Sequence, residues 1–183
     1  MPWSAWCWFK LKPLLEAAGH RVSAFDLSAS GTNTKVIQDV ATLADYSMPL
    51  LEFMATIPPE KKVVLVGHSL GAWCWFKLKP LLEAAGHRVS AFDLSASGTN
   101  TKVIQDVATL ADYSMPLLEF MATIPPEKKV VLVGHSLGGM NLALAMEKFP
   151  EKISISVFLT AFMPDTVHTP SYVIDQYNKV IKL

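Results

Sequence analysis

The stretch Val130-Val-Leu-Val-Gly-His-Ser-Leu-Gly-Gly139 decides the fold of this chain. Its first four residues are apolar and mostly β-branched, which is typical of a buried strand, and apolar residues at helical spacing follow from Met140 to Phe149. Between the two stands G-x-S-x-G, with Ser136 at its centre. A strand, this motif and a helix in this order predict a sharp turn that exposes the serine hydroxyl.

The chemistry of this turn follows from its residue types. Glycines at positions 134 and 138 let the strand and the helix approach each other closely, which larger side chains would prevent. The backbone N–H of Leu137 would then lie at a helix N-terminus and face negative charge that develops on a substrate oxygen. The motif therefore predicts a nucleophile elbow, and the alternative is a buried structural serine.

Composition indicates a globular domain with a substantial core, because 51% of the 183 residues are hydrophobic and 17% are charged. The formal net charge is zero, and no cluster of Lys and Arg is present, so charge gives no reason to expect nucleic acid or an anionic membrane as a partner. No group of residues has the spacing of a metal site, and we expect no metal or organic cofactor.

The N-terminus shows no signal-peptide pattern, and no apolar stretch approaches the length that crosses a bilayer. Cys7 and Cys74 occupy the same place in a repeat, so they provide no disulfide framework. We therefore expect a reducing, cytoplasmic compartment.

The chain contains a duplication without a single substitution: residues Ala5–Gly71 and Ala72–Gly138 are the same 67-residue string. The repeats of solenoids are shorter and diverge between copies, and this unit ends inside the G-x-S-x-G motif. We interpret it as a recent duplication or an artefact of gene prediction. Residues 1–71 are then a partial duplicate, and residues 72–183 carry the motif in its full context.

Helical and strand patterns alternate along the second part. Helices are predicted over residues 75–85, 106–123, 140–149 and 171–182, and strands over residues 88–94, 130–133 and 153–159. Asp26 and Asp93 end strands in the two copies, where we expect them to cap turns. The alternation predicts an α/β fold with a parallel, doubly wound sheet.

Two segments together carry a family resemblance: AWCWFKLKPLLEAAGHRVSAFDLSASG at 72–98 and PLLEFMATIPPEKKVVLVGHSLGGMNLALAMEKFPEKISISVFLTAFMPD at 116–165. They resemble the plant methylesterase family of the α/β-hydrolase fold, which also includes the hydroxynitrile lyases. The resemblance implies that residues 72–183 are the N-terminal half of such a domain, with an incomplete sheet that lacks the later strands. It implies a carboxylic-ester hydrolase for methyl esters of small hormone acids, such as methyl salicylate, methyl jasmonate and methyl indole-3-acetate.

The resemblance also implies roles for individual residues. Ser136 matches the nucleophile, and Leu137 matches the residue whose N–H forms half of the oxyanion hole. Phe162 and Tyr177 match positions that line the acyl pocket or its lid in relatives, although both are equally well explained as ordinary core aromatics. The lyase branch reads G-E-S-C-G at the elbow, so His135 and Leu137 favour the esterase branch.

The chain departs from the family pattern before the AWCW segment. There the family has a strand and a loop that supply the second oxyanion N–H, whereas this chain has Val63–Gly71, the first copy of the elbow sequence. We hypothesise that this segment substitutes for the missing strand and loop. Ser69 would then be a loop residue that faces Ser136 and binds substrate, not a second nucleophile.

The second departure concerns the catalytic triad, whose Asp and His follow the serine in this fold. In relatives both come later than the residue that matches Leu183, and a serine without a base is a weak nucleophile. A catalytically dead pseudoenzyme or small-acid binder is therefore an alternative. Asp165 and His168 are a local substitute that we disfavour, because a three-residue separation makes it hard for the histidine to reach Ser136.

The expected partner is a small-molecule ester. Two identical segments compete for one place in the fold, so a homodimer or a domain-swapped oligomer is also expected.

Overall fold

The computed structural model describes residues 13, 16–17, 23, 26–58, 62–66, 75–165 and 167–181. Its centre is a four-stranded sheet in the order β2-β1-β3-β4. The strands are β1 (Lys62–Val66), β2 (Arg88–Phe92), β3 (Val130–Ser136) and β4 (Ile153–Ala161). Every neighbouring pair is parallel, as the alternating sequence pattern predicts.

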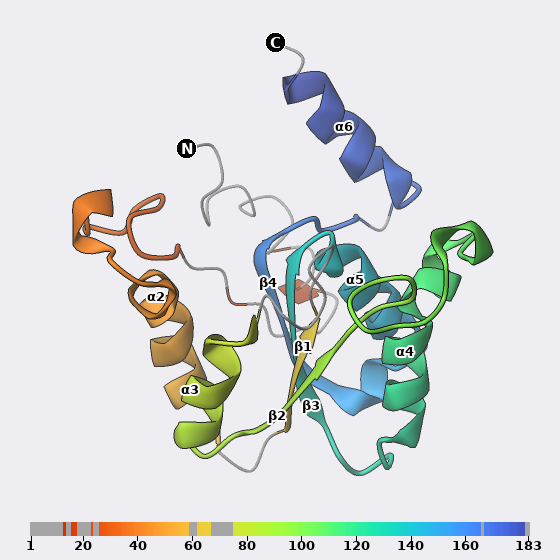
Figure 1. The fold of residues 1–183 in the computed structure, drawn as a ribbon, viewed down its shortest axis with the longest axis horizontal. Coiled ribbons are helices and arrows are strands. Elements are labelled where there is room, and N and C mark those ends of the chain that lie inside the picture. The colour runs from red at the N-terminus through yellow and green to blue at the C-terminus, as the bar shows by residue number, and fades with distance from the viewer. Residues whose placement is uncertain are drawn as a thin grey trace.

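Helices cover both faces of this sheet. They are α2 (Leu43–Ala55), α3 (Leu78–Ala84), α4 (Leu110–Thr123), α5 (Gly138–Lys148) and α6 (Ser171–Ile181), with 3-10 turns at Ile37–Asp39, Ile104–Asp106 and Pro150–Lys152. Figure 1 shows α2 and α3 on one side of the strands and α4 and α5 on the other, while α6 extends away from these layers. The predicted doubly wound architecture is therefore confirmed.

The sheet separates two hydrophobic cores, because successive strand residues point to opposite faces. One core joins Leu50 and Leu82, from α2 and α3, to Leu65 of β1. The other joins Leu117 and Leu142, from α4 and α5, to strand residues of the opposite face. All these leucines are fully buried, so both faces of the sheet are shielded from water.

β1 comes from the first copy of the duplication and lies in the middle of the sheet, between β2 and β3. The strand part of the hypothesised substitute, residues 63–66, thus lies within a strand of the sheet. A strand from residues 1–71 and three strands from residues 72–183 thus form one sheet.

The two copies of the strand sequence bury opposite sets of side chains. Leu65 contributes to the α2/α3 core, whereas Leu132, the same residue of the second copy, contributes to the α4/α5 core. The register explains this reversal, because Lys62 pairs with Val130 and not with its own equivalent, Lys129. A one-residue shift exchanges the two faces of a strand. The sequence V-V-L-V tolerates either orientation because all four residues are apolar.

The helix predicted from residue 106 instead begins at Leu110. Thr109 caps it: the Thr109 hydroxyl accepts a hydrogen bond from the Asp112 N–H at 3.1 Å, and the Asp112 carboxylate accepts one from the Thr109 N–H at 3.0 Å. Such a capping box satisfies N–H groups that have no partner inside the helix. Thr42 and Asp45 form the same box at the start of α2.

The strand predicted over 88–94 ends at Phe92, because Asp93 turns the chain. Its carboxylate accepts hydrogen bonds from the N–H of Thr99 at 2.9 Å and from the Thr99 hydroxyl at 2.8 Å. Asp26 makes the same two bonds to Thr32. The predicted turn-capping role of both aspartates is confirmed.

Candidate active site

Ser136 lies at a sharp turn between β3 and α5. It is the last residue of the strand and has a φ of +55°, in the left-handed region that residues other than glycine rarely adopt. Leu137 is the N-cap of α5, with helical dihedral angles, and the helix begins at Gly138. The predicted strand, turn and helix are therefore confirmed. Ser136 as a whole is half-buried.

Three glycines allow this turn to pack tightly. A Cβ atom on Gly134 would lie 3.1 Å from the carbonyl carbon of Gly138, which confirms the predicted close approach of strand and helix. A Cβ atom on Gly138 would lie 2.7 Å from the carbonyl oxygen of Val66, at the end of β1. On Gly139 it would overlap the carbonyl oxygen of Phe162. The elbow is thus enclosed by β1 on one side and by the segment after β4 on the other.

Phe162 contacts the elbow through its backbone. Its N–H donates a hydrogen bond of 2.9 Å to the carbonyl oxygen of Ser136, and its side chain is half-buried. The sequence predicted a place near the site for this residue but gave no indication of this bond. Tyr177 lies on α6, and its side chain is outside the described part of the structure, as is the whole of Ser69.

Behind the elbow lies a pair of buried polar side chains, Asn141 and Ser114, that the sequence analysis did not predict. The Asn141 side-chain amide donates to the Leu137 carbonyl oxygen at 3.2 Å, and its oxygen lies 2.6 Å from the Ser114 hydroxyl. Both side chains are fully buried. The one available signal was Asn141 itself, a polar residue within the apolar segment G-G-M-N-L-A-L-A.

His135 precedes the nucleophile position and faces the α2/α3 core. Its ring packs edge-to-face against the buried indole of Trp75, with ring centroids 6.3 Å apart and an interplanar angle of 83°. Aromatic rings favour this arrangement because a positive edge meets a negative face. The contact ties β3 to the residues that precede α3.

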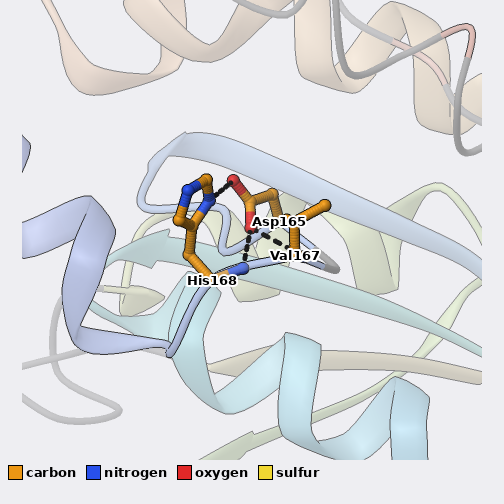
Figure 2. A network of polar contacts seen from close by, with 3 residues as sticks. All are labelled: Asp165, Val167 and His168. Carbon is orange, nitrogen blue, oxygen red and sulfur yellow. Dashed lines mark hydrogen bonds and ion pairs between the residues drawn. The ribbon is translucent and has the colours of Figure 1, made fainter.

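Asp165 and His168 form a carboxylate–imidazole pair in the loop after β4 (Figure 2). The Asp165 carboxylate lies 2.7 Å from Nδ1 of His168 and accepts the backbone N–H groups of His168, at 2.7 Å, and Val167, at 3.0 Å. These bonds, first that from the His168 backbone, hold the pKa of Asp165 below its ordinary value. The His168 ring stacks on Tyr172 at 3.9 Å.

This pair has the orientation of a triad acid and base, but it is not joined to the nucleophile. Among the described residues, no side chain makes a hydrogen bond to the Ser136 hydroxyl. The His168 side chain is 45% exposed. The structure therefore brings together Ser136, Leu137 and Phe162, and it pairs Asp165 with His168 separately.

Comparison with known proteins fits this geometry. The profile of the alpha/beta hydrolase fold matches residues 72–181, and an alpha/beta hydrolase family profile matches residues 1–74. The chain belongs to the alpha/beta hydrolase family.

Within this family the chain is similar to plant methylesterases and related enzymes. Salicylic acid-binding protein 2 of Nicotiana tabacum is 60% identical over 120 residues, which cover 65% of this chain and 46% of that protein. Norfluorocurarine synthase 1 of Strychnos nux-vomica is 64% identical over 114 residues, which cover 62% of this chain and 43% of that protein. The crystal structure of polyneuridine aldehyde esterase matches with a TM-score of 0.65 and 56% identity, covering 66% of this chain and 48% of that one. The chain thus spans less than half the length of these relatives.

Metal-binding clusters and membrane-spanning helices are both absent from the described ranges, 13, 16–17, 23, 26–58, 62–66, 75–165 and 167–181. No three His, Cys, Asp or Glu side chains gather there in a way that would hold a metal ion. No helix in those ranges has the length and apolar character needed to cross a membrane.

Proposed function

We propose that this protein is a serine carboxylic-ester hydrolase of the plant methylesterase type. The observation that carries the proposal is Ser136, a non-glycine residue with a positive φ between a parallel strand and the N-terminus of α5. Strained backbone of this kind persists where the surrounding structure enforces it, and it is concentrated at functional sites.

The reaction would proceed by nucleophilic substitution at the ester carbonyl. The Ser136 oxygen attacks the carbonyl carbon, and the Leu137 N–H binds the oxyanion of the tetrahedral intermediate. Methanol leaves with the serine proton, which a base transfers, and water then hydrolyses the acyl-serine. Preorganised N–H donors lower the barrier because the negative charge is larger in the transition state than in the substrate.

The proton transfer requires a base next to Ser136. The resemblance places the triad Asp and His in the portion of the relatives that this chain does not span. Because no described side chain bonds to the Ser136 hydroxyl, a second candidate function is a catalytically inactive binder of small acids. Loss of the histidine from such a triad costs on the order of a millionfold in turnover, so the two functions differ widely in measurable rate.

Covalent labelling separates these functions. We expect a fluorophosphonate probe to modify the wild-type chain at Ser136, as located by mass spectrometry of the digested adduct, and to leave Ser136→Ala unmodified. A wild-type rate no higher than that of free serine would support the inactive binder instead. His168→Ala tests the local pair: labelling at the wild-type rate excludes His168 as the base, whereas a large loss would assign it that role.

We propose a role for Ser69 in the loop that follows β1. Residues 67–71 continue directly from β1, whose last carbonyl, that of Val66, lies against the Gly138 position. We propose that this loop supplies the second donor and contacts substrate without acting as a nucleophile. Ser136→Ala should abolish esterase activity and Ser69→Ala should reduce it less, and a larger loss for Ser69→Ala would reject the assignment.

The substrates we propose are methyl esters of small hormone acids, among them methyl salicylate, methyl jasmonate and methyl indole-3-acetate. The similarity to proteins named methylesterase and salicylic acid-binding protein supports this class. Phe162 and Tyr177 are the proposed substrate-binding aromatics. Release of cyanide from a cyanohydrin would instead identify a hydroxynitrile lyase.

The proposed setting is the cytoplasm. The balanced charge of the chain supports a small-molecule substrate over a nucleic acid or membrane partner. A homodimer or domain-swapped oligomer is proposed because two identical segments are present, and sedimentation velocity over a range of protein concentrations would test it.

A further inference from the structure

We propose that Asn141, held in place by Ser114, is a positioning residue that orients the Leu137 backbone for oxyanion binding. This inference rests on the proposed esterase function, in which the Leu137 N–H is a donor to the oxyanion. It assigns a role to the buried polar side chains of Asn141 and Ser114, which the proposed reaction does not otherwise use.

The contacts form a chain from α4 to the elbow. The Ser114 hydroxyl lies 2.6 Å from the side-chain oxygen of Asn141, and the Asn141 side-chain nitrogen lies 3.2 Å from the carbonyl oxygen of Leu137. Both side chains are 0% exposed. Because buried polar groups are costly unless they are bonded, each partner strongly constrains the other.

The orientation of the Asn141 amide follows from its neighbours. The Leu137 carbonyl can only accept a hydrogen bond, so the NH₂ group of Asn141 must face it. The amide oxygen then faces Ser114, whose single hydroxyl proton it can accept. Leu110, whose carbonyl oxygen lies 2.7 Å from the same hydroxyl, offers an alternative acceptor when Asn141 is absent.

The hydrogen bond from Asn141 holds the carbonyl of the same residue whose N–H would bind the oxyanion. The Leu137 carbonyl belongs to the Leu137–Gly138 peptide and also accepts the N–H of Met140 at 3.0 Å, so Asn141 adds a restraint on the peptide unit that follows the donor. On the other side, the N–H of Phe162 holds the Ser136 carbonyl. The Ser136–Leu137 peptide, which carries the donor N–H, and the Leu137–Gly138 peptide that follows it are therefore each held by hydrogen bonds, which preorganises the donor before substrate binds.

The duplication provides a matched control. Ser47 on α2 is the equivalent of Ser114 in the first copy, has the same neighbours in sequence and is also buried. It belongs to the helix layer on the opposite face of the sheet from α5 (Figure 1). Ser47→Ala therefore removes the equivalent hydroxyl without affecting the hydrogen bonds of Asn141.

The test compares Asn141→Leu, Ser114→Ala and Ser47→Ala in a methyl-ester assay. Asn141→Leu leaves the Ser114 hydroxyl bonded to Leu110, so it creates no unpaired buried donor and should fold. We expect about a tenfold fall in kcat with KM unchanged, because an oxyanion donor acts in the transition state. Ser114→Ala should have a smaller effect in the same direction, and Ser47→Ala should leave kcat at the wild-type value.

Asn141→Asp adds a readout that a purely structural role would not change. At neutral pH its carboxylate would face the Leu137 carbonyl without a proton to donate, whereas the protonated acid can donate. Burial raises the pKa of such a carboxyl. The kcat of Asn141→Asp relative to wild type should therefore rise as the pH falls from 8 to 5, while that of Asn141→Leu stays constant over this pH range.

Hydrogen exchange makes the outcome independent of activity. In Asn141→Leu the amides of residues 134–141 should exchange faster, and those of β1 should not change. Unchanged exchange together with an unchanged kcat would overturn the inference.

A wild-type chain that hydrolyses no ester and fails to label would reject the proposed function, and the exchange result would then decide the positioning role alone. If Ser47→Ala lowers kcat as much as Ser114→Ala, the effect is on general stability and the inference is wrong.

Discussion

The N–H of Phe162 and the carbonyl oxygen of Ser136 are joined by a hydrogen bond of 2.9 Å. In a trans peptide the C=O and N–H bonds point in opposite directions from the same plane. Anchoring the Ser136 carbonyl therefore also sets the direction of the Leu137 N–H. The segment after β4 thus controls the orientation of a donor that belongs to the β3–α5 turn.

Gly139→Ala tests this relationship, because a methyl group there would overlap the Phe162 carbonyl oxygen. Relief requires Phe162 to move away, which weakens its bond to Ser136. We expect a loss of about 3 kcal/mol in the free energy of unfolding, within the range for overpacked sites, and a large loss of fluorophosphonate labelling.

Gly134→Ala is the control for this substitution. Its methyl group would meet the Leu142 side-chain terminus at 2.8 Å, which can rotate, as well as backbone at 3.1 Å. We expect a smaller loss, about 1 kcal/mol, by chemical denaturation. Equal losses for the two variants would argue against a special role for Phe162.

Ser136→Gly should stabilise the protein relative to Ser136→Ala while both lose labelling. The φ of +55° is strained for alanine and serine but not for glycine. We expect a difference of about 1 kcal/mol in urea unfolding, since single left-handed residues cost this much. If Ser136→Gly is the less stable of the two, the positive φ is not a property of the folded protein.

Thr42→Ala and Thr109→Ala remove the same capping bond from α2 and α4. The bonds from Asp45 and Asp112 to these hydroxyls are both 3.1 Å long. Each substitution should lower the free energy of unfolding by about 1 kcal/mol, and the double variant by the sum. A silent Thr42→Ala beside a destabilising Thr109→Ala would show that α2 does not dock as described.

The stability of the turn at Asp165 should decrease when the pH becomes acidic. Hydrogen bonds from His168 lower the pKa of Asp165 in the folded chain, so the stabilising effect is complete above the ordinary aspartate value of about 3.9. It is lost as the pH falls through the lower, folded-state value. In ¹H–¹⁵N spectra, the amide signals of Val167 and His168 should shift in that acidic range.

Asp165→Ala should remove this titration and shift both signals already at neutral pH. Unchanged signals in that variant would mean that the carboxylate does not hold the turn.

Much of the fold was readable from local sequence. The alternating apolar patterns predicted the parallel sheet, and Thr109 and Asp93 explain why two predicted elements are shorter than expected. These features depend on contacts within a few residues along the chain. The elbow turn was equally readable, because its glycines and serine are adjacent in sequence.

The supporting contacts were not readable, since they join residues far apart in the chain. The hydrogen bond between Phe162 and Ser136 joins the segment after β4 to the end of β3, and the one between Ser114 and Asn141 joins α4 to α5. No spacing rule connects such positions. Only packing of the layers places them together.

The apolar sequence V-V-L-V predicts a buried strand in each copy, and both copies form one. The tertiary structure decided which way each copy faces: Leu65 toward α2 and α3, and Leu132 toward α4 and α5. The physical reason is that a strand apolar at every position gains the same burial in either orientation, so its register against its neighbours makes the choice.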